Sequence, residues 1–600
     1  MGQDKKIKRR EEIAEQYKWH MAEMYADELI WEEDFKKAQT AAKRFADFSG
    51  KLSESADKLY EAFHEKDQVY KLCEKIYVYA RMKKDEDNRI DRYQTMSDRA
   101  QGLIAEISAL TSFFVPELLE MQEETIAAFM AQNKSLKVYD HLIGDLFRQK
   151  AHILSKSEEN LLAQISELTA ATTNIFSMIN NADIKFGNIR DEDGDEIELT
   201  HGRYIGFMES DNREVRKAAF SAMYGAYEKQ RNTLATTYNY NTKTDVVMAR
   251  IRKYDSAIKA GLDGDNIPLD VYDNLVTTVN DRLDLLHRYV EVRRHLLKID
   301  QVHMYDMYTP LVPSYNKKIE YKAGLDMIRS GLAPLGEEYI AHMNKGLSSG
   351  WADVYENEGK TSGAYSFGCY DSLPYILLNY NNKLKDVFTI AHEMGHSMHS
   401  YYTRASQPYT YGGHSIFTAE VASTVNEVLL MQHLLERATD KKEKLYLLNL
   451  YIEEFRTTLF RQTMFAEFEK MTHAEVAAGG VLTSDWLCDH YSVLNKKYFG
   501  PKVVYDPEIS MEWSRIPHFY HAFYVYKYAT GYSAAVALSN RILTGGDQAR
   551  ADYLNFLKSG DSDYPVALLN KAGVNMAVAE PIIKALDTFE NLIVEIEKIV

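Results

Sequence analysis

Two histidines and a glutamate in one short stretch have the types and spacing of a metal-dependent hydrolase. His392, Glu393 and His396 lie within the run DVFTIAHEMGHSMHS, residues 386–400. In an α-helix, side chains four residues apart lie on the same face, so both imidazoles can bind one metal ion. Glu393 lies about 100° round the helix from His392, near the metal but outside its ligand set. That position suits a general base that takes a proton from a metal-bound water molecule.

A catalytic zinc site usually has three protein ligands and one open position, so a third ligand is needed. His399 lies one turn beyond His396, but ligands on three successive turns of one straight helix do not converge easily on a tetrahedral ion. The metzincin pattern requires glycine and histidine where this chain has His399 and Tyr402, which excludes that class. Glu420 remains, in the helix-compatible run IFTAEVAST after a turn rich in Gly, Pro and Tyr from Gln407 to His414. We predict that the two motif histidines and Glu420 bind the metal.

The three ligands meet only if the segment that carries Glu420 returns antiparallel to the histidine helix. Glu427, two turns further along the face of Glu420, is then well placed to orient a ligand histidine by a hydrogen bond. Upstream of the histidines, Leu384 and Val387 have the apolar spacing of a helix, and Asp386 favours a helix N-terminus. The sequence therefore predicts that a pair of helices carries the metal site.

Two β elements interrupt an otherwise helical chain. The runs GAYSFG (363–368) and YILLNY (375–380) precede the histidine helix and have strand-like patterns. An edge strand there would bind an extended peptide through main-chain hydrogen bonds, although the residues fit a strand buried on both sides equally well. Earlier, FGNIRDEDGDEIEL (186–199) predicts a hairpin around an acidic turn. Its alternating aspartates do not make an EF-hand, because the chain has Glu196 where glycine is required and Gly202 where glutamate is required.

The runs HEMGHSMHS and AEVASTVNE, in which Glu420 follows His396 by 24 residues, resemble the thimet-oligopeptidase family of zinc peptidases, most closely its bacterial oligoendopeptidase F branch. Three further runs agree in order: GAYSFGCYDSLPYILLNYNN, IPHFYHAFYVYKYATGYSAA and, approximately, RIRKYDSAI at 250–258. The likeness covers most of the chain beyond about residue 200. It implies a mainly α, zincin-type gluzincin fold, with two helical lobes enclosing a deep channel and a small β-sheet beside the active-site helix.

We place the lobe boundary directly after the hairpin. It divides an N-terminal helical lobe, residues 1–202, from a zinc metallopeptidase catalytic domain, residues 203–600. The N-terminal part reads as successive amphipathic helices, and the low proline content, 12 in 600 residues, permits long helices.

Near the C-terminus, Pro517 is predicted to open a helix with tyrosines at every fourth position from Tyr520 to Tyr532. Tyrosine hydroxyls require partners, which favours the wall of a wet cleft over a dry core.

The family resemblance implies that a histidine and tyrosines of this segment face the zinc and hydrogen-bond the tetrahedral intermediate. It assigns these roles to His518, Tyr524 and Tyr528, whereas His521 is not expected to be the matching histidine. Tyr526 competes for one role, because the run YVYKY permits more than one alignment with the family.

The composition describes a globular protein of more than one lobe. Its 600 residues exceed a single ordinary core, and 45% are hydrophobic and 26% charged. The net charge of −17 argues against nucleic acid or an anionic membrane as a partner. We identify no run of about eighteen apolar residues and no apolar signal segment at the start, and three cysteines are too few for a disulfide framework. These features predict a cytoplasmic protein; none of them indicates an oligomeric state.

Together, the motifs predict an endopeptidase with one zinc ion per chain that hydrolyses internal bonds of short unfolded oligopeptides. Glu393 would take a proton from the zinc-bound water as it attacks the scissile carbonyl and pass it to the leaving amine, without a covalent intermediate. Two alternatives stay open: a carboxypeptidase-type zinc hydrolase, which would release single terminal residues, and an inactive helical peptide-binding scaffold. The intact motif, with Glu420 in place, argues against the scaffold.

Overall fold

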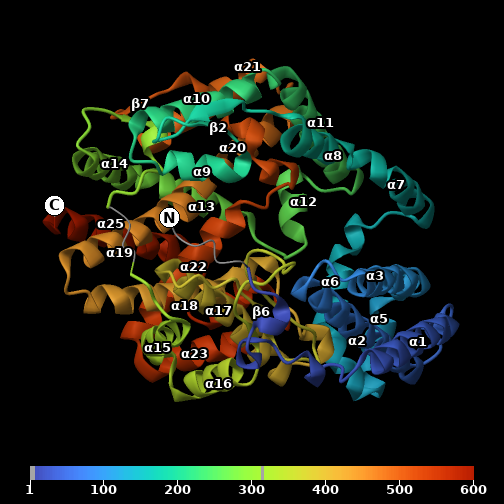
Figure 1. Cartoon of the computed structure of the whole chain (residues 1–600). Coiled ribbons are helices and arrows are strands. Elements are labelled where there is room, and N and C mark those ends of the chain that lie inside the picture. Colours follow the sequence, from blue (N-terminus) through green and yellow to red (C-terminus); the bar gives the residue numbers. More distant parts are fainter. Residues whose placement is uncertain (1–6, 313–316, 600) are drawn as a thin grey trace. The chain divides into compact units, whose positions relative to one another are not determined.

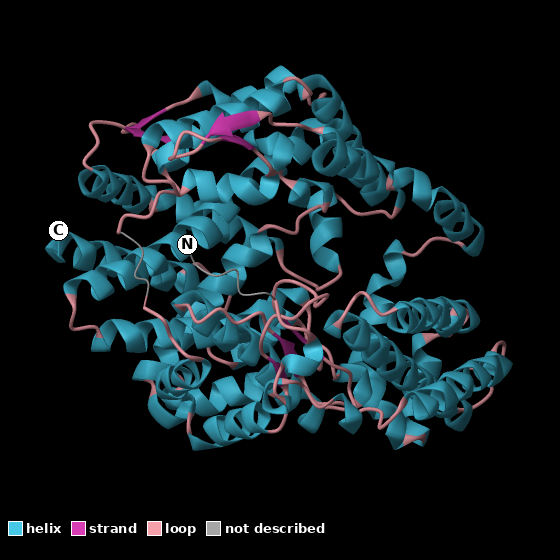
Figure 2. Cartoon of the chain, in the orientation of Figure 1, coloured by secondary structure: helices cyan, strands magenta, loops and turns pink. Residues whose placement is uncertain are grey.

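A computed structural model describes residues 7–312 and 317–599. Helices dominate these residues, and the strands are few and short (Figure 2). The predicted mainly α class is therefore confirmed. The chain forms two compact units, each assembled from segments far apart in sequence. Unit 1 comprises Met1–Lys150, Asn316–His433 and Leu538–Gly573; unit 2 comprises Ala151–Tyr315, Leu434–Ala537 and Val574–Val600.

The helices of unit 1 belong to its three segments (Figure 1). They are α1 (Glu28–Phe45), α2 (Ala56–Glu86), α3 (Asp91–Thr111), α4 (Phe114–Glu120), α5 (Glu123–Gln132), α6 (Asp140–Gln149), α15 (Tyr321–Gly331), α16 (Glu337–Ser348), α17 (Leu384–Ser406), α23 (Gly546–Leu557) and α24 (Pro565–Lys571). Its strands are β4 (Ala352–Asp353), β5 (Tyr365–Phe367) and β6 (Tyr375–Leu377). Two helices, α18 (Ile416–Arg437) and α22 (Tyr526–Thr544), continue across a division between units.

Unit 2 is built from helices and two short two-stranded sheets. The helices are α7 (Lys156–Thr169), α8 (Ala171–Met178), α9 (His201–Met208), α10 (Arg213–Glu228), α11 (Arg231–Ile251), α12 (Ala257–Asp263), α13 (Leu269–Asp281), α14 (Leu283–Leu297), α19 (Lys441–Glu454), α20 (Arg461–Ala477), α21 (Ser484–Phe499) and α25 (Glu580–Ile599). The strands are β1 (Asn188–Arg190), β2 (Glu196–Glu198), β3 (Val302–His303) and β7 (Val503–Val504).

The compact units do not follow the sequence division at residue 202. Residues 151–202 group with unit 2, because α8 packs on α11 and β1 packs on α10. The division into an N-terminal lobe, residues 1–202, and a catalytic domain, residues 203–600, stays a prediction. The channel expected between the lobes also stays a prediction.

Unit 1 contains the sheet that was predicted beside the histidine helix. Its strand order is β4-β6-β5, with β6 parallel to β4 and antiparallel to β5. All three residues of the central strand β6 are buried, whereas those of β5 are half-buried. Both strands pack against α17. The sheet beside the helix is confirmed, and β5 is one of its two edge strands within the described part of the chain.

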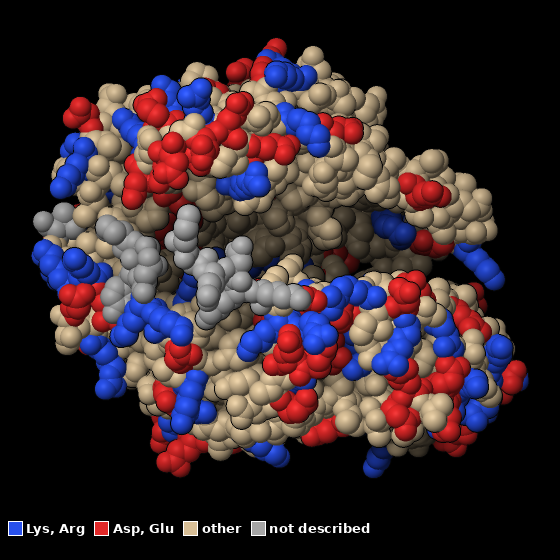
Figure 3. All heavy atoms as spheres, viewed as in Figure 1, with Lys and Arg blue, Asp and Glu red and all other residues tan. Residues whose placement is uncertain are grey.

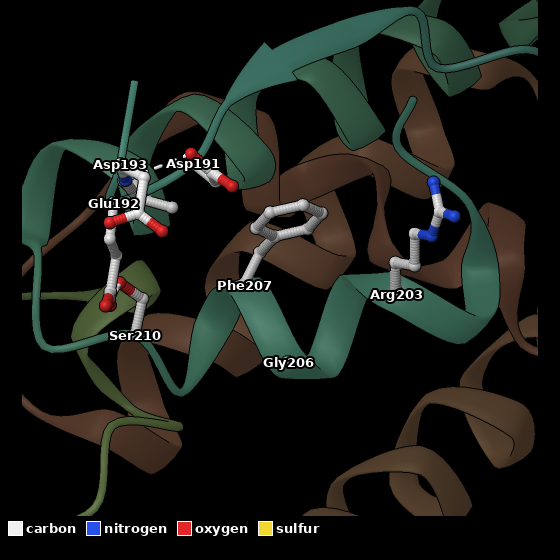
Figure 4. A pocket seen from close by; sticks show the side chains of 8 residues that line it. Asp191, Glu192, Asp193, Arg203, Gly206, Phe207 and Ser210 are labelled. Atoms are coloured by element: carbon white, nitrogen blue, oxygen red, sulfur yellow. Dashed lines mark hydrogen bonds between the residues drawn. The ribbon is translucent and has the colours of Figure 1, made fainter. Parts of the chain in front are cut away.

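The acidic hairpin forms as predicted, with Asn188 paired to Glu198 and Arg190 to Glu196. Within its turn, the Asp191 carboxylate accepts the backbone N–H of Asp193 at 3.0 Å (Figure 4). It also accepts the backbone N–H of Asp195 at 2.9 Å. One aspartate thus closes the turn on itself, as in an Asx turn.

One stretch meets a membrane-span criterion by composition. Asp91–Glu120 is long and apolar enough, by length and composition alone, to cross a membrane, although it contains no run of eighteen consecutive apolar residues. In the structure it consists of α3 and α4, which are interrupted at Ser112 and Phe113. α3 packs against α1 and α2 in the core of unit 1. A core helix can satisfy the same composition criterion.

The prediction of one continuous helix from Pro517 is wrong. Pro517–Tyr520 is a 3₁₀ turn, and α22 begins only at Tyr526. Between them, Phe523 has φ +53°, in the left-handed region, which a helix cannot include. Tertiary contacts override the local helical spacing here.

Acidic and basic side chains are mixed over the face of the molecule shown in Figure 3. A continuous basic stripe, of the kind that follows a nucleic-acid backbone, is not visible on it.

Candidate metal centre and active site

A close contact between two helices builds the centre. α17 and α18 lie side by side in unit 1 (Figure 1). A Cβ atom on Gly395 would lie 2.5 Å from the Cα of Ser423, so only glycine permits this approach. One turn away, the Asn426 side chain donates to the carbonyl oxygen of Ala391 at 3.0 Å. The two helices therefore run antiparallel, as predicted.

This packing brings three potential ligand atoms together. His392 Nε2 lies 3.2 Å from His396 Nε2, and Glu420 Oε2 lies 3.3 Å and 3.4 Å from them. A tetrahedral ion with bonds of about 2.0–2.2 Å requires ligand atoms roughly 3.3–3.6 Å apart. The triangle thus has the size of one face of such a coordination sphere. Within the described residues, these three form the group identified as able to hold a metal ion.

The charges around the triangle favour a cation. Glu427 Oε2 lies 3.1 Å from Nδ1 of His392, on the side of the ring away from the other ligands. Burial alone would lower the pKa of His392, but hydrogen bonds with Glu420 and Glu427 outweigh it and raise that pKa to about 11. The donor set therefore stabilises a positive charge strongly, and it fits a divalent metal ion that would replace the proton.

Glu393 lies beside the triangle without belonging to it. Its side chain is buried, and burial is the largest effect on its pKa, which is raised above the usual range. A backbone hydrogen bond from Ser366 on β5 opposes this rise. The hydroxyls of Ser366 and Ser397 lie 2.8 Å apart and tie the same strand to α17. The carboxyl group therefore lies between the ligand helix and the edge strand.

His399 is buried and packs against another aromatic ring. Its ring is 1% exposed and stacks on His414, with centroids 4.0 Å apart and planes 8° apart. Burial lowers its pKa well below the usual value. His399 is not in the potential ligand group, in agreement with its rejection from the sequence.

The C-terminal candidates cluster within unit 2. Tyr528 Oη lies 3.3 Å from Nε2 of His518, and the rings of Tyr524 and Tyr528 meet edge to face at 5.4 Å. All three side chains are half-buried, whereas Tyr526 is fully buried and packs against Tyr272. Because these residues belong to unit 2 and the metal ligands to unit 1, their role at the metal stays a prediction.

Sequence reasoning missed a cavity beside β5. It has a volume of about 610 Å³ and lies within unit 1. Its lining includes Phe367, Tyr370, Tyr409, Glu74 and Arg404. Arg404 donates to the carbonyl oxygen of Gly368 at 3.1 Å, directly after the edge strand. These residues come from distant segments; the run around Phe367 and the turn from Gln407 to His414 stood out in the sequence, but nothing indicated that they meet at a cavity.

The fold and the paired metal-binding helices define a metallopeptidase of the gluzincin type. Residues 206–588 match Peptidase family M3, and residues 117–186 match the family described as Oligopeptidase F. The chain belongs to peptidase family M3.

Proteins that match over nearly the whole length agree with this assignment. Oligopeptidase PepF of Bacillus subtilis is 47% identical over 602 residues, which cover 100% of this chain and 90% of that protein. Group B oligopeptidase PepB of Streptococcus agalactiae is 41% identical and covers 98% of both chains. Among solved structures, oligoendopeptidase-F from Enterococcus faecium has a TM-score of 0.74 at 38% identity, with coverage of 95% and 99%. A Chlamydophila abortus protein has a TM-score of 0.94 at 35% identity, with coverage of 99% and 100%.

Proposed function

We propose that this metallopeptidase is a zinc-dependent endopeptidase that cleaves internal bonds of short unfolded oligopeptides. The ligand triangle of His392, His396 and Glu420, with Glu393 beside it, is the observation that carries the proposal. Two imidazoles and one carboxylate are a known catalytic zinc set. The matching relatives are named as oligopeptidases, which supports short peptides as substrates.

A bound zinc ion would supply Lewis acidity and lower the pKa of water at its open position to about 7. Glu393 accepts a proton from the attacking water and delivers it to the leaving amine nitrogen. Its raised pKa suits a group that must both take and return a proton. His518, Tyr524 and Tyr528 donate hydrogen bonds to the developing oxyanion.

Residues of unit 1 hold the substrate main chain. The outer edge of β5, which no further strand covers among the described residues, binds an extended peptide through main-chain hydrogen bonds, which explains binding without a fixed sequence. The cavity beside Phe367 accepts one substrate side chain.

Zinc content and cleavage products test this function together. We expect elemental analysis of the purified protein to give about one zinc per chain, because three ligands form one site. In a mixed peptide library analysed by mass spectrometry, cleavage should occur at internal bonds and stop when a chelator removes the metal. Protein that lacks metal yet cleaves in the presence of chelator would refute the proposal, as would release of single terminal residues only.

Tyr528→Phe should lower kcat on a short peptide by roughly 100-fold or more, with little change in KM or metal content. The phenol hydroxyl interacts more strongly as charge develops on the oxyanion, so its loss weakens the transition state rather than the bound substrate. Steady-state kinetics and elemental analysis measure both effects.

Tyr526→Phe is the matched control for this change, since its ring is fully buried and should leave kcat unchanged. Tyr524→Phe, made in parallel, shows whether the neighbouring half-buried hydroxyl shares the role. Full kcat in both half-buried variants, alongside an inactive His392→Ala variant, would mean that these tyrosines only pack.

A further inference from the structure

Between the 3₁₀ turn Pro517–Tyr520 and α22, the chain passes through a left-handed residue at Phe523, directly before the tyrosines assigned to the site. The φ of +53° lies in a region that side chains other than glycine rarely adopt. Backbone strain of this kind persists only where surrounding contacts fix the conformation. Contacts around Phe523 must therefore hold this backbone conformation.

Contacts within unit 2 hold Phe523 from several sides. Its N–H donates to Oε1 of Glu469 on α20 at 2.7 Å, in a fully buried position. Its ring lies against His473, with centroids 4.5 Å apart. From the other side, a Cβ atom on Gly261 would lie 2.9 Å from the Cδ2 of the ring. Gly261 lies inside α12, where alanine would be the better helix former, so the ring of Phe523 explains the glycine.

Glu469 acts on Phe523 as an acceptor and not as a countercharge. Its side chain is 0% exposed, and no cation is paired with it among the described residues. The charged neighbour is Asp245, itself an anion, and His473 Nε2 is engaged with that carboxylate at 3.3 Å. Burial raises the pKa of Glu469 well above its usual range, opposed by the Phe523 N–H and reinforced by Asp245. Burial therefore favours the neutral form of this carboxyl group.

The turn at Phe523 determines where the site tyrosines lie. In a continuous helix from Pro517, residues 518 and 528 would be about 15 Å apart along the axis. In the structure, Tyr528 Oη lies 3.3 Å from His518 Nε2. The break thus folds the two hydroxyl-bearing residues back onto the histidine. The start of α22 is also tied to the loop after α12, through Lys527 and Asp265 at 2.7 Å.

We infer that Glu469 is a positioning residue for catalysis, which holds the turn at Phe523 and so places Tyr524 and Tyr528 beside His518. The inference rests on the proposed function, in which these three side chains donate to the reacting carbonyl oxygen. Glu469 acts only through the backbone of Phe523. Gly261 makes the same placement possible from the opposite side of the ring.

A pair of substitutions at Glu469 separates its acceptor role from its volume. Glu469→Leu keeps most of the volume and removes the acceptor, so kcat on a short peptide should fall roughly 10- to 100-fold with KM and metal content unchanged. Glu469→Gln keeps a neutral acceptor and should restore kcat to within about threefold of the wild type.

Two further variants keep the test independent of folding. Gly261→Ala presses on the ring of Phe523 from α12 and should lower kcat about tenfold, again without a change in KM. Tyr498→Phe removes a buried hydrogen bond to Glu467, 2.9 Å long, elsewhere in unit 2. It is the matched control, and it should lower Tm while kcat stays at the wild-type value.

Wild-type kcat in both Glu469→Leu and Gly261→Ala would overturn the inference. So would a Gln variant as impaired as the Leu variant, or an equal loss of kcat in Tyr498→Phe. The Tyr528→Phe variant shows whether only the positioning role of Glu469 is refuted or the proposed role of the tyrosines as well. If Tyr528→Phe loses kcat while Glu469→Leu does not, only the positioning role is refuted. If Tyr524→Phe and Tyr528→Phe both keep full kcat, the tyrosine assignment fails and the positioning role fails with it.

Discussion

Glu393→Gln should lower kcat by roughly 10²- to 10⁴-fold while the protein keeps its full metal content. The amide cannot accept a proton from the attacking water, whereas the ligand triangle of His392, His396 and Glu420 does not include this residue. The substitution preserves side-chain volume and an oxygen that can accept the Ser366 backbone hydrogen bond. Folding and KM should therefore change little. Kinetics on a short peptide, with elemental analysis of the same sample, measure both quantities.

The kcat and the metal content of the Glu393→Gln variant together separate an effect on proton transfer from an effect on metal binding. His392→Ala is the comparison, because it should lose activity together with metal. A Gln variant that cleaves peptides near the wild-type rate would show that another group is the base. A Gln variant without metal would show instead that Glu393 supports the metal site, and its activity loss would then say nothing about proton transfer.

The metal centre is the part of the site that the sequence predicts best, for a physical reason. The spacing of His392 and His396 is local, and helix geometry fixes their common face once the helix forms. Glu420 also needed a turn and an antiparallel return, and the segment from Gln407 to His414 indicated that turn. The contact of Gly395 with Ser423 could not be predicted, because nothing local states which helix face a glycine presents to a neighbour.

The C-terminal segment shows the opposite case. A tyrosine at every fourth position from Tyr520 predicts one helix, yet the chain breaks at Phe523. There the Phe523 N–H donates to Glu469, 54 residues away in the chain, and the Phe523 ring packs on Gly261 of another helix. Tertiary contacts of this range override local propensity and are not visible in a pattern of spacings. The interleaved units were not predicted for the same reason, since each joins three segments that lie apart in the chain.

Glu420→Ala should weaken metal binding so far that the metal is lost on dialysis, and it should lower kcat/KM by about 10³-fold or more. The carboxylate completes the triangle, and it supplies the negative charge that two neutral imidazoles lack. Unlike Glu393→Gln, this change should lose activity because the metal is absent, so added zinc should restore activity in part. Elemental analysis after dialysis, and activity titrated against added zinc, separate the two cases.

Glu427→Gln is the matched control for Glu420→Ala, on the same helix two turns away. Its oxygen lies 3.1 Å from Nδ1 of His392, on the far side of the ring from the other ligands. It should therefore keep the metal, with affinity weakened about 10- to 100-fold, since it orients a ligand without being one. Full metal content in Glu420→Ala, or metal loss in Glu427→Gln as complete as in Glu420→Ala, would mean that the third ligand is misassigned. The antiparallel contact at Gly395 would then serve to bring Glu427 to the histidine, and Glu420 would be a neighbour of the site only.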